Sequence, residues 1–458
     1  MSYLAFWIVL AILLVVVIAT SILRYLHGAP QSAAARRSLG RREGSPTVPT
    51  LGARRPEAVR ALEALQQNER EAAGEPLLSP EDFQRQFKEN IHQKIISDRL
   101  DRLRTKNLEA IIHATVGSEK QAEEECAAML RAWHLDDPTQ WSRYELPNIR
   151  CDLARICASI EAIFARFNWP LSEFPVVGTL TTGRESATTQ PTATGTPLIL
   201  IDNGFFKFAT IMSQLAIFAP YDAQYKGGFS TVTLQLVSDL VATHTILNTC
   251  LYAYPRKVPT DFQSRFGNFQ WAIGVFVIAH EYAHVSAGDY NAHPSNPNQQ
   301  DTSRHEKELR ADRAGFIATV EVLRGKNGGA CGVFGPFLYL AGLDLLARAA
   351  VAYEGRPSPA LTDPSYPTPY ERTVSLLEWL QMSDYRKEFG DQIGQASACY
   401  NTILFAWDQI MPAFVAARDE LSAFDPARQG GQVGGYPLDE ARTFGLVQTL
   451  WRHVQARL

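Results

Sequence analysis

Residues 271–288 read WAIGVFVIAHEYAHVSAG, an apolar run that ends in the motif HEYAH at 280–284. On a helix, His280 and His284 lie on one face, so both imidazoles can reach one metal ion. Glu281 is rotated by about 100° and can address a water on that metal instead. Two histidines and a third protein ligand leave one position open, which is the arrangement of a catalytic zinc site.

The run that precedes the motif indicates that this helix is buried. Residues 274–279 are apolar nearly all round, and Gly288 predicts where the helix ends. Buried histidine and glutamate side chains need partners, because unpaired polar groups in a protein interior are costly. A metal ion would supply such a partner, whereas the alternative is a core helix whose histidines make ordinary hydrogen bonds.

The third metal ligand is predicted within residues 305–316, HEKELRADRAGF. Glu308 and Asp312 are four residues apart and share a helical face. We expect Glu308 to bind the metal, and Asp312 to accept the remaining ring N–H of a ligand histidine. Ala311 and Gly315 have little bulk, which lets this helix pack close to the HEYAH helix.

Other residues near the motif remain open as alternatives. Glu306 and His305 could replace Glu308 as the third ligand. Asp289 follows Gly288, and we interpret it as a turn residue, with a role in supporting a metal ligand as the alternative. The polar stretch 290–304 between the two helices is interpreted as a solvent loop, with a lid as the alternative.

HExxH followed by a second helix that reads ExxAD resembles the gluzincin metallopeptidases. The nearest likenesses are the heat-shock-protease and CAAX-prenyl-protease family and the Lit-like phage-exclusion peptidases. The resemblance covers residues 170–380. It implies a zincin-like catalytic domain of the α+β class, predominantly helical with a small edge β-hairpin or sheet. It also implies one zinc ion per chain, held by His280, His284 and Glu308.

Two further stretches resemble parts of this family. Residues 176–182 and 197–202 resemble the β-hairpin that such enzymes use as a substrate-binding edge, with the Thr-rich stretch 181–196 as a flexible tip. The resemblance implies that the first stretch pairs with an extended substrate by β-addition. The substrate-binding residues expected there are Thr179, Leu180 and Thr181.

Residues 367–372, PTPYER, resemble the family's His-Pro…Glu-Arg segment. The usual histidine is missing, and Tyr366 stands before the proline. Stabilising the oxyanion of a peptide-cleaving reaction requires a nearby hydrogen-bond donor or cation. Tyr366, Tyr370 and Arg372 are the candidates, and the catalytic set we expect is Glu281 with Tyr370 and Arg372.

Residues 3–23 contain no charge and are long enough to cross a bilayer. Arginines follow this segment and none precedes it. The positive-inside rule therefore predicts a single-pass anchor, with the amino terminus outside and the remaining chain in the cytoplasm, as in a bacterial inner membrane. A cleaved signal peptide is the alternative, but the segment lacks a basic start.

Composition limits the classes of protein to which this chain can belong. The chain has 458 residues, a net charge of −4 and six scattered cysteines, so we expect reduced thiols and no nucleic-acid binding. The apolar stretch 331–351 is interrupted by Asp344 and Arg348 at i,i+4 spacing. It predicts a buried core helix with an ion pair, not a second membrane span.

A helix is expected to begin at Ser79, with an apolar stripe through residues 83–103, and residues 120–168 are expected to continue as helix. The segment before it has few large apolar groups, which is typical of a tether, with a short helix near 56–72. The predicted organisation is an anchor at 1–23, a flexible tether at 24–78, a helical accessory region at 79–168 and the metallopeptidase domain at 169–458.

The function predicted from these features is a membrane-anchored, zinc-dependent endopeptidase that acts on protein or peptide substrates. Glu281 would take a proton from the attacking water and return it to the leaving amine. One alternative is a catalytically inactive zincin-fold scaffold or membrane-tethered interaction protein. Another is a metal-dependent hydrolase of a different bond. The sequence leaves the substrate and the oligomeric state open.

Overall fold

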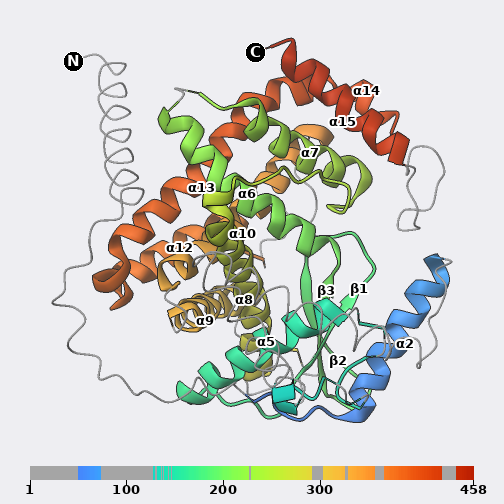
Figure 1. The fold of residues 1–458 in the computed structure, drawn as a ribbon, viewed down its shortest axis with the longest axis vertical. Helices are drawn as coiled ribbons and strands as arrows, with labels where there is room; N and C mark the ends of the chain where they lie inside the picture. Colours follow the sequence, from blue (N-terminus) through green and yellow to red (C-terminus); the bar gives the residue numbers. More distant parts are fainter. Residues whose placement is uncertain are drawn as a thin grey trace, which may run out of the picture.

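Three long helices that meet side by side form the centre of the computed structural model (Figure 1). They are α8 (Gln263–Ala287), α9 (Arg304–Arg324) and α10 (Gly329–Glu354). The structure describes residues 50–73, most of 127–145, and 147–225, 228–290, 303–324, 328–355, 366–424 and 440–457. The predicted anchor 3–23, the stripe 83–103 and most of the loop 290–304 lie outside these residues.

Helix α8 carries the HEYAH motif and is surrounded by other elements, as its apolar sequence predicts. Its residues from Ala272 to Ala283 are all buried. The helix ends at Gly288, whose φ of 71° is the left-handed conformation that glycine adopts without strain. The predicted helix end at Gly288 is therefore confirmed.

Helix α10 is the core helix expected from the apolar stretch 331–351. Among the described residues it is the one helix long and apolar enough to cross a membrane. It packs instead against α8, α9 and α13 (Tyr385–Ala416). Asp344 accepts hydrogen bonds from Arg348 Nε at 3.1 Å and from Tyr400 OH at 2.6 Å, so the polar groups of this helix are satisfied internally.

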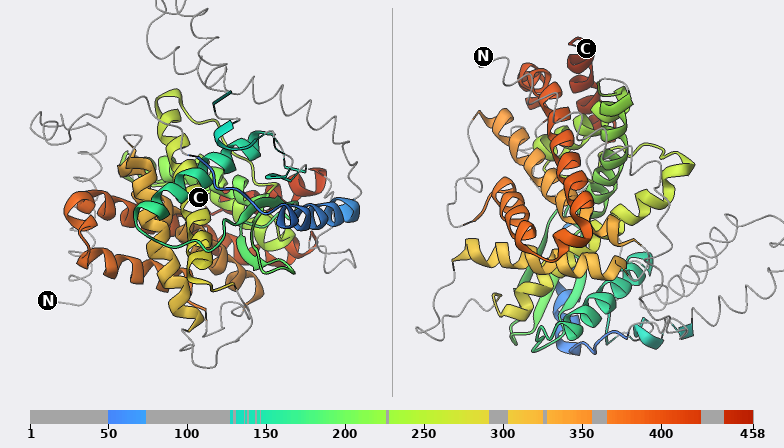
Figure 2. Two further views of the ribbon diagram at one scale, coloured as in Figure 1. Left: turned by 90° about the horizontal axis from the view of Figure 1, so that it is seen from below. Right: turned by 90° about the vertical axis from the view of Figure 1, so that its left-hand side faces the viewer.

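The remaining helices cover this centre on several sides (Figure 2). They share amphipathic or apolar sequences whose buried faces join one continuous hydrophobic core. They are α5 (Pro147–Arg166), α6 (Gly204–Tyr225), α7 (Thr231–Leu247), α12 (Pro369–Met382), α14 (Arg418–Ser422) and α15 (Glu440–Gln455), with the short 3₁₀ helix η2 (Thr260–Phe262) before α8. The described part of the chain is thus predominantly helical.

A three-stranded sheet with the order β1-β3-β2 completes the fold. Strand β1 (Val176–Leu180) pairs parallel to β3 (Pro197–Asp202), and β2 (Ala187–Pro191) pairs antiparallel to β3. The predicted hairpin of 176–182 with 197–202 is therefore wrong. The supposed flexible tip contains β2, and its β-branched threonines suit a strand. The hairpin is formed by β2 and β3, with its turn at residues 192–196.

Residues 50–73 differ from the predicted tether. The expected helix is present as α2 (Pro56–Ala73). Its Ala58, Val59 and Leu62 pack in a small apolar cluster against β1 and β3. This part of the chain covers the sheet and belongs to the fold.

The accessory region also differs in part from its prediction. The described residues of 133–145 form turns, so the helix expected over 120–168 is interrupted. Helix α5 packs against α8 and α9, and its apolar residues lie in the main core.

Candidate metal centre

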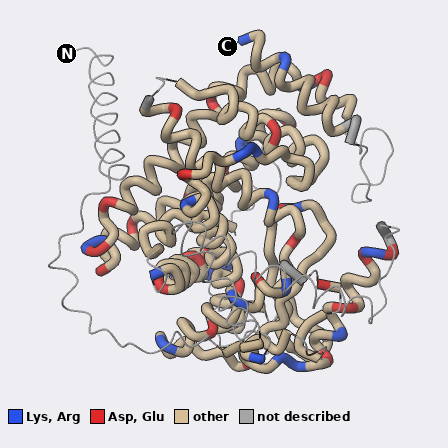
Figure 3. The backbone as a smooth tube through the Cα atoms, viewed as in Figure 1, with Lys and Arg blue, Asp and Glu red and all other residues tan. Residues whose placement is uncertain are grey.

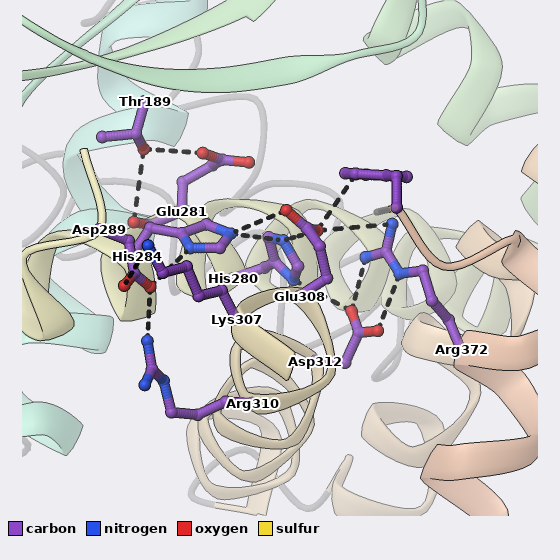
Figure 4. Close-up of polar contacts among 11 residues, drawn as sticks. Thr189, His280, Glu281, His284, Asp289, Lys307, Glu308, Arg310, Asp312 and Arg372 are labelled. Carbon is purple, nitrogen blue, oxygen red and sulfur yellow. Dashed lines mark hydrogen bonds and ion pairs between the residues drawn. The ribbon is translucent and has the colours of Figure 1, made fainter. Parts of the chain in front are cut away.

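His280 and His284 on α8 meet Glu308 on α9 at the bottom of a cleft (Figure 4). The two Nε2 atoms lie 3.2 Å apart. Glu308 Oε2 lies 3.2 Å from His280 Nε2, and Glu308 Oε1 lies 3.5 Å from His284 Nε2. The three side chains form a largely buried cluster that could hold a metal ion. Among the described residues, neither Glu306 nor His305 joins it.

The close approach of α8 and α9 depends on a missing side chain. A Cβ atom added to Gly315 would lie 3.1 Å from the carbonyl oxygen and ring of Phe276 on α8. Ala311 beside it is fully buried. The small residues of α9 thus bring Glu308 within reach of the histidines, as the sequence predicts.

A carboxylate faces the second nitrogen of each ring. His280 Nδ1 lies 3.0 Å from Asp312 Oδ1, and His284 Nδ1 lies 3.1 Å from Asp289 Oδ2. Because a carboxylate only accepts, the proton of each neutral ring belongs on Nδ1, and the Nε2 lone pairs point toward Glu308. Two lone pairs and a carboxylate that converge on one point repel each other unless a cation lies between them.

Arginines hold these two carboxylates in turn. Arg372 donates two hydrogen bonds to Asp312, at 2.8 and 2.6 Å, and Arg310 donates one to Asp289 at 2.6 Å. Burial raises the pKa of Asp312, but Arg372 and His280 outweigh it and lower the pKa to about 2. The structure therefore places Arg372 on Asp312, and its Nη1 atom lies 4.0 Å from Glu308 Oε2. These contacts indicate a positioning role for Arg372, and its expected role at the oxyanion stays a prediction.

Asp289 was interpreted as a turn residue, with a role in supporting a metal ligand as the alternative, and the structure shows both the turn and a contact with His284. It does follow the left-handed Gly288, and its backbone N–H donates to the His284 carbonyl at 3.0 Å. This turn is also what swings its side chain back onto His284. Its position five residues after His284, just beyond the helix end, is the signal from which the contact could have been predicted.

The same contacts change the protonation of the site when no metal is bound. Burial opposes protonation of His284, but its contacts with Asp289 and Glu308 outweigh burial and raise its pKa to about 10. Burial raises the pKa of Glu308, yet the two histidines hold it well below its usual range. A proton and a metal ion therefore compete for this cluster.

Glu281 points away from the two histidines, toward the sheet (Figure 4). Its Oε2 atom accepts a hydrogen bond from Thr189 Oγ1 of β2 at 2.7 Å. Glu281 also lines the cleft beside the metal cluster. The position fits a group that acts on a water or substrate in the cleft and not on the metal itself. Thr189 is not among the predicted site residues, because the pattern of residues 181–196 indicated a flexible tip and not a strand.

Tyr366, and not Tyr370, belongs to the site. The Tyr366 hydroxyl donates to Glu308 Oε2 at 3.1 Å, and the residue lines the cleft. Tyr370 is 56% exposed and does not line it. The reason is local: Thr368 caps α12, and the helix that follows turns Tyr370 outward while burying Arg372.

The cleft has a volume of about 420 Å³ and runs between β2 and the first turn of α9. A second cavity of about 240 Å³ adjoins it and shares Ala187, His280 and Glu281. The walls that are specific to this cavity are mostly apolar and include Val277, Tyr339, Leu343 and Pro367. The site therefore has a polar end and an apolar end.

The expected substrate-binding residues Thr179, Leu180 and Thr181 do not reach this cleft. They end β1, at the opposite edge of the sheet from β2. That edge is already occupied, because Thr179 N donates to Glu145 at 2.5 Å and Thr181 N donates to Glu69 of α2 at 2.9 Å. The strand beside the site is β2, whose Ala187, Thr188 and Thr189 line the cleft.

No protein-family model, no curated protein and no solved structure matches this chain at a significant level.

Proposed function

We propose that this protein is a zinc-dependent endopeptidase with a zincin-like catalytic site. The observation that carries the proposal is the spacing of the ligand atoms. Ligands of a tetrahedral zinc ion, each about 2.0–2.1 Å from the metal, lie roughly 3.3 Å from one another. The two Nε2 atoms lie 3.2 Å apart, and Glu308 offers Oε2 at 3.2 Å from His280 Nε2 and Oε1 at 3.5 Å from His284 Nε2. The donor set of two imidazoles and one carboxylate suits zinc and leaves one position for a reactant.

Glu281 is the proposed general base. A zinc ion held here supplies a Lewis acid that polarises a peptide carbonyl and makes water more acidic. Glu281 accepts a proton from the attacking water and later delivers it to the leaving amine. The hydrogen bond from Thr189 directs one carboxylate oxygen, which supports a defined orientation of this base.

Tyr366 is the proposed hydrogen-bond donor to the oxyanion. Burial and the nearby Glu308 raise the pKa of its hydroxyl, so the group keeps its proton at neutral pH despite the opposing effect of Arg372. A neutral hydroxyl at the edge of the metal cluster can donate to the charge that develops on a substrate oxygen.

Strand β2 is the proposed substrate-binding edge, in place of β1. Asp202 N donates to Ser186 O, and Thr192 N donates to Thr196 O, so the even-numbered residues between them face β3. By alternation, Ala187 and Thr189 direct their backbone N–H and C=O groups away from β3, on the cleft side. An extended peptide can pair with these groups by β-addition.

The proposal includes a membrane anchor and a location for the site. Residues 3–23 would anchor the chain as a single-pass membrane protein, with the site on the cytoplasmic side, and the gluzincin-like pattern of HExxH and ExxAD supports the peptidase class. The tether between anchor and fold would then end near residue 50, since α2 is part of the fold.

The test compares wild type with Glu281→Gln and Glu308→Ala, each as the full chain in detergent. We expect one zinc per wild-type chain, retained in Glu281→Gln and lost in Glu308→Ala, measured by atomic absorption. We expect wild type to cleave a labelled, unfolded protein and both variants to be at least about a thousandfold slower.

The three outcomes separate the candidate functions. Cleavage that survives Glu281→Gln would refute the proposed mechanism. Bound zinc without cleavage of any peptide bond would favour the inactive scaffold or a hydrolase of another bond. A folded wild type without metal would remove the basis of the proposal.

A further inference from the structure

Two basic side chains from the first turn of α9 line the cleft. They are Arg304 and Lys307, which are three residues apart and so lie on one face of the helix. The Arg304 guanidinium lies 5.0 Å from the ring centre of Tyr366, which holds it beside the metal cluster. In Figure 3, basic and acidic residues lie close together on this helix.

The stability of the helix does not explain these two cations. The start of a helix carries the positive end of its dipole, which favours acidic groups and disfavours basic ones. Arg310, one turn further on, pairs with Asp289 at 2.6 Å. Within the described ranges, by contrast, Arg304 pairs with no carboxylate, and Lys307 makes only a long ion pair, with its Nζ 3.9 Å from Asp289 Oδ1.

The acidic groups of the cleft are already engaged. Glu308 faces the two histidines, and Asp289 is held by His284 and Arg310. Glu281 accepts from Thr189. A ligand that enters the cleft at the α9 end therefore meets available positive charge, whereas the adjoining cavity at the other end is mostly apolar.

We propose that Arg304 and Lys307 select substrates that carry an acidic side chain close to the cleaved bond. The inference rests on the proposed peptidase function and adds the substrate class to it. A guanidinium donates to a carboxylate in a planar pair, and a lysine ammonium adds a second positive charge on the same wall. Opposite charges across such a cleft act on both specificity and the rate of encounter.

The test uses one peptide that wild type cleaves, with both termini blocked. Glu, Gln or Lys is placed in turn at each position on either side of the cleaved bond, and kcat/KM is measured at low salt. We expect one position at which Glu exceeds Lys by about tenfold, which is typical for partly exposed charge pairs. The ratio should shrink as salt is raised, because ions screen exposed charges.

Charge reversal then identifies the residues. In Arg304→Glu the ratio should invert in favour of Lys, and in Lys307→Gln it should fall by about threefold. The matched control is Lys257→Glu, which makes the same kind of charge change in an exposed loop that does not line the cleft, and should keep the wild-type ratio. Zinc content is measured in each variant, because Lys307 lies near Asp289.

Binding gives a second measurement that is independent of turnover. Zinc-loaded Glu281→Gln should bind the labelled Glu peptide about tenfold more tightly than the Lys peptide, by fluorescence anisotropy. Adding Arg304→Glu to this variant should remove the difference.

The outcomes distinguish this inference from the function on which it rests. Equal cleavage of the Glu, Gln and Lys peptides, abolished by Glu281→Gln, would overturn the inference and leave the peptidase standing. An unchanged ratio in Arg304→Glu would do the same. The same peptide is also measured with a free carboxyl terminus. If only this form is preferred over the blocked one, the two cations recognise the end of a substrate chain and not an acidic side chain, and the inference is overturned. Absence of any cleavage and of any peptide binding would overturn both.

Discussion

At the scale of single residues, each histidine of the cluster is held by a carboxylate, and each carboxylate is held by an arginine. Asp312 with Arg372 serves His280, and Asp289 with Arg310 serves His284. Such partners fix the tautomer and the direction of a metal-binding imidazole and raise its basicity. The histidines are therefore oriented before a metal arrives, which lowers the entropy lost on binding it.

The raised pKa of His284 makes a prediction for the metal-free protein. A folded-state pKa of about 10, against an ordinary 6.5, stabilises the fold fully below about pH 6.5, and this contribution is lost as pH rises toward 10. We expect the free energy of unfolding to fall by on the order of 5 kcal/mol across this range. Urea unfolding in the presence of a chelator, at a series of pH values, measures it.

The variant His284→Gln should lose most of this pH dependence, whereas His453→Gln on α15, far from the cluster in sequence and fold, should keep it. Zinc has to displace the same proton, so zinc affinity should rise with pH over the same range. Identical pH profiles for wild type and His284→Gln would contradict the assignment.

Replacing Tyr366 with Phe tests the donor to the oxyanion. We expect kcat to fall by roughly 100-fold, the magnitude found when one such donor is removed, with zinc content unchanged. The matched control is Tyr370→Phe, which removes a hydroxyl that is 56% exposed and should leave kcat unchanged. If wild type and Tyr366→Phe have equal kinetics, another group stabilises the oxyanion.

At the scale of elements, two segments form opposite walls of the cleft. Helix α9 supplies the ligand Glu308, the carboxylate Asp312 and the cations of its first turn. Strand β2 supplies an edge whose other side is secured by β3. The outer edge of β1 is already occupied by Glu145 and α2. The edge of β2 is therefore the sheet edge with which an incoming chain can pair.

A pair of proline substitutions tests the role of the β2 edge. The N–H of Ala187 faces away from β3, so Ala187→Pro should keep the fold and the zinc while raising KM roughly tenfold through one lost backbone hydrogen bond to substrate. The N–H of Thr188 faces β3, so Thr188→Pro should cost about 1–3 kcal/mol of stability instead. Steady-state kinetics and urea unfolding separate the two effects. A KM that is unchanged in a folded Ala187→Pro would argue against β-addition.

At the scale of the whole molecule, a buried network ties two distant segments to helix α8. Arg54 donates to Glu161 of α5 at 2.5 Å and to Tyr282 OH at 3.2 Å, and Tyr282 donates to Glu161 at 2.7 Å. Tyr282 is the third residue of the HEYAH motif. The segment before α2 therefore helps to set the position of α8, on the face opposite the metal.

Breaking this network should affect stability and zinc affinity together. Arg54→Met leaves Glu161 buried with its charge unpaired, which costs about 3–5 kcal/mol. Arg55→Met is the matched control, because the neighbouring arginine is half exposed and its ion pair with Glu173 should contribute less than about 1 kcal/mol. Urea unfolding measures the stability of both variants, and zinc titration measures their zinc affinity. A similar small loss in both variants would show that the network does not stabilise the fold.

Some features followed from local sequence because they depend on contacts within a few residues. The i,i+4 spacing of His280 and His284 determines their common face on any helix, and the spacing of Glu308 and Asp312 does the same on α9. Gly288 signals the end of α8 through its left-handed φ. The apolar run and the ion pair of α10 likewise indicated a core helix.

Other features depended on long-range pairing, which local patterns do not specify. Whether β1 or β2 borders the site is decided by which strand joins β3 on each side, and the choice depends on α2 and Glu145 far away in the chain. Tyr366 and Tyr370 are four residues apart in the sequence, and only the packing of α12 turns one inward and the other outward. The sequence by itself determined the common face of His280 and His284 and that of Glu308 and Asp312, because helix geometry relates residues four apart over one turn. The tertiary structure decided that β2, Tyr366 and the two cations of α9 border the cleft, because each position depends on segments brought together only when the core closes.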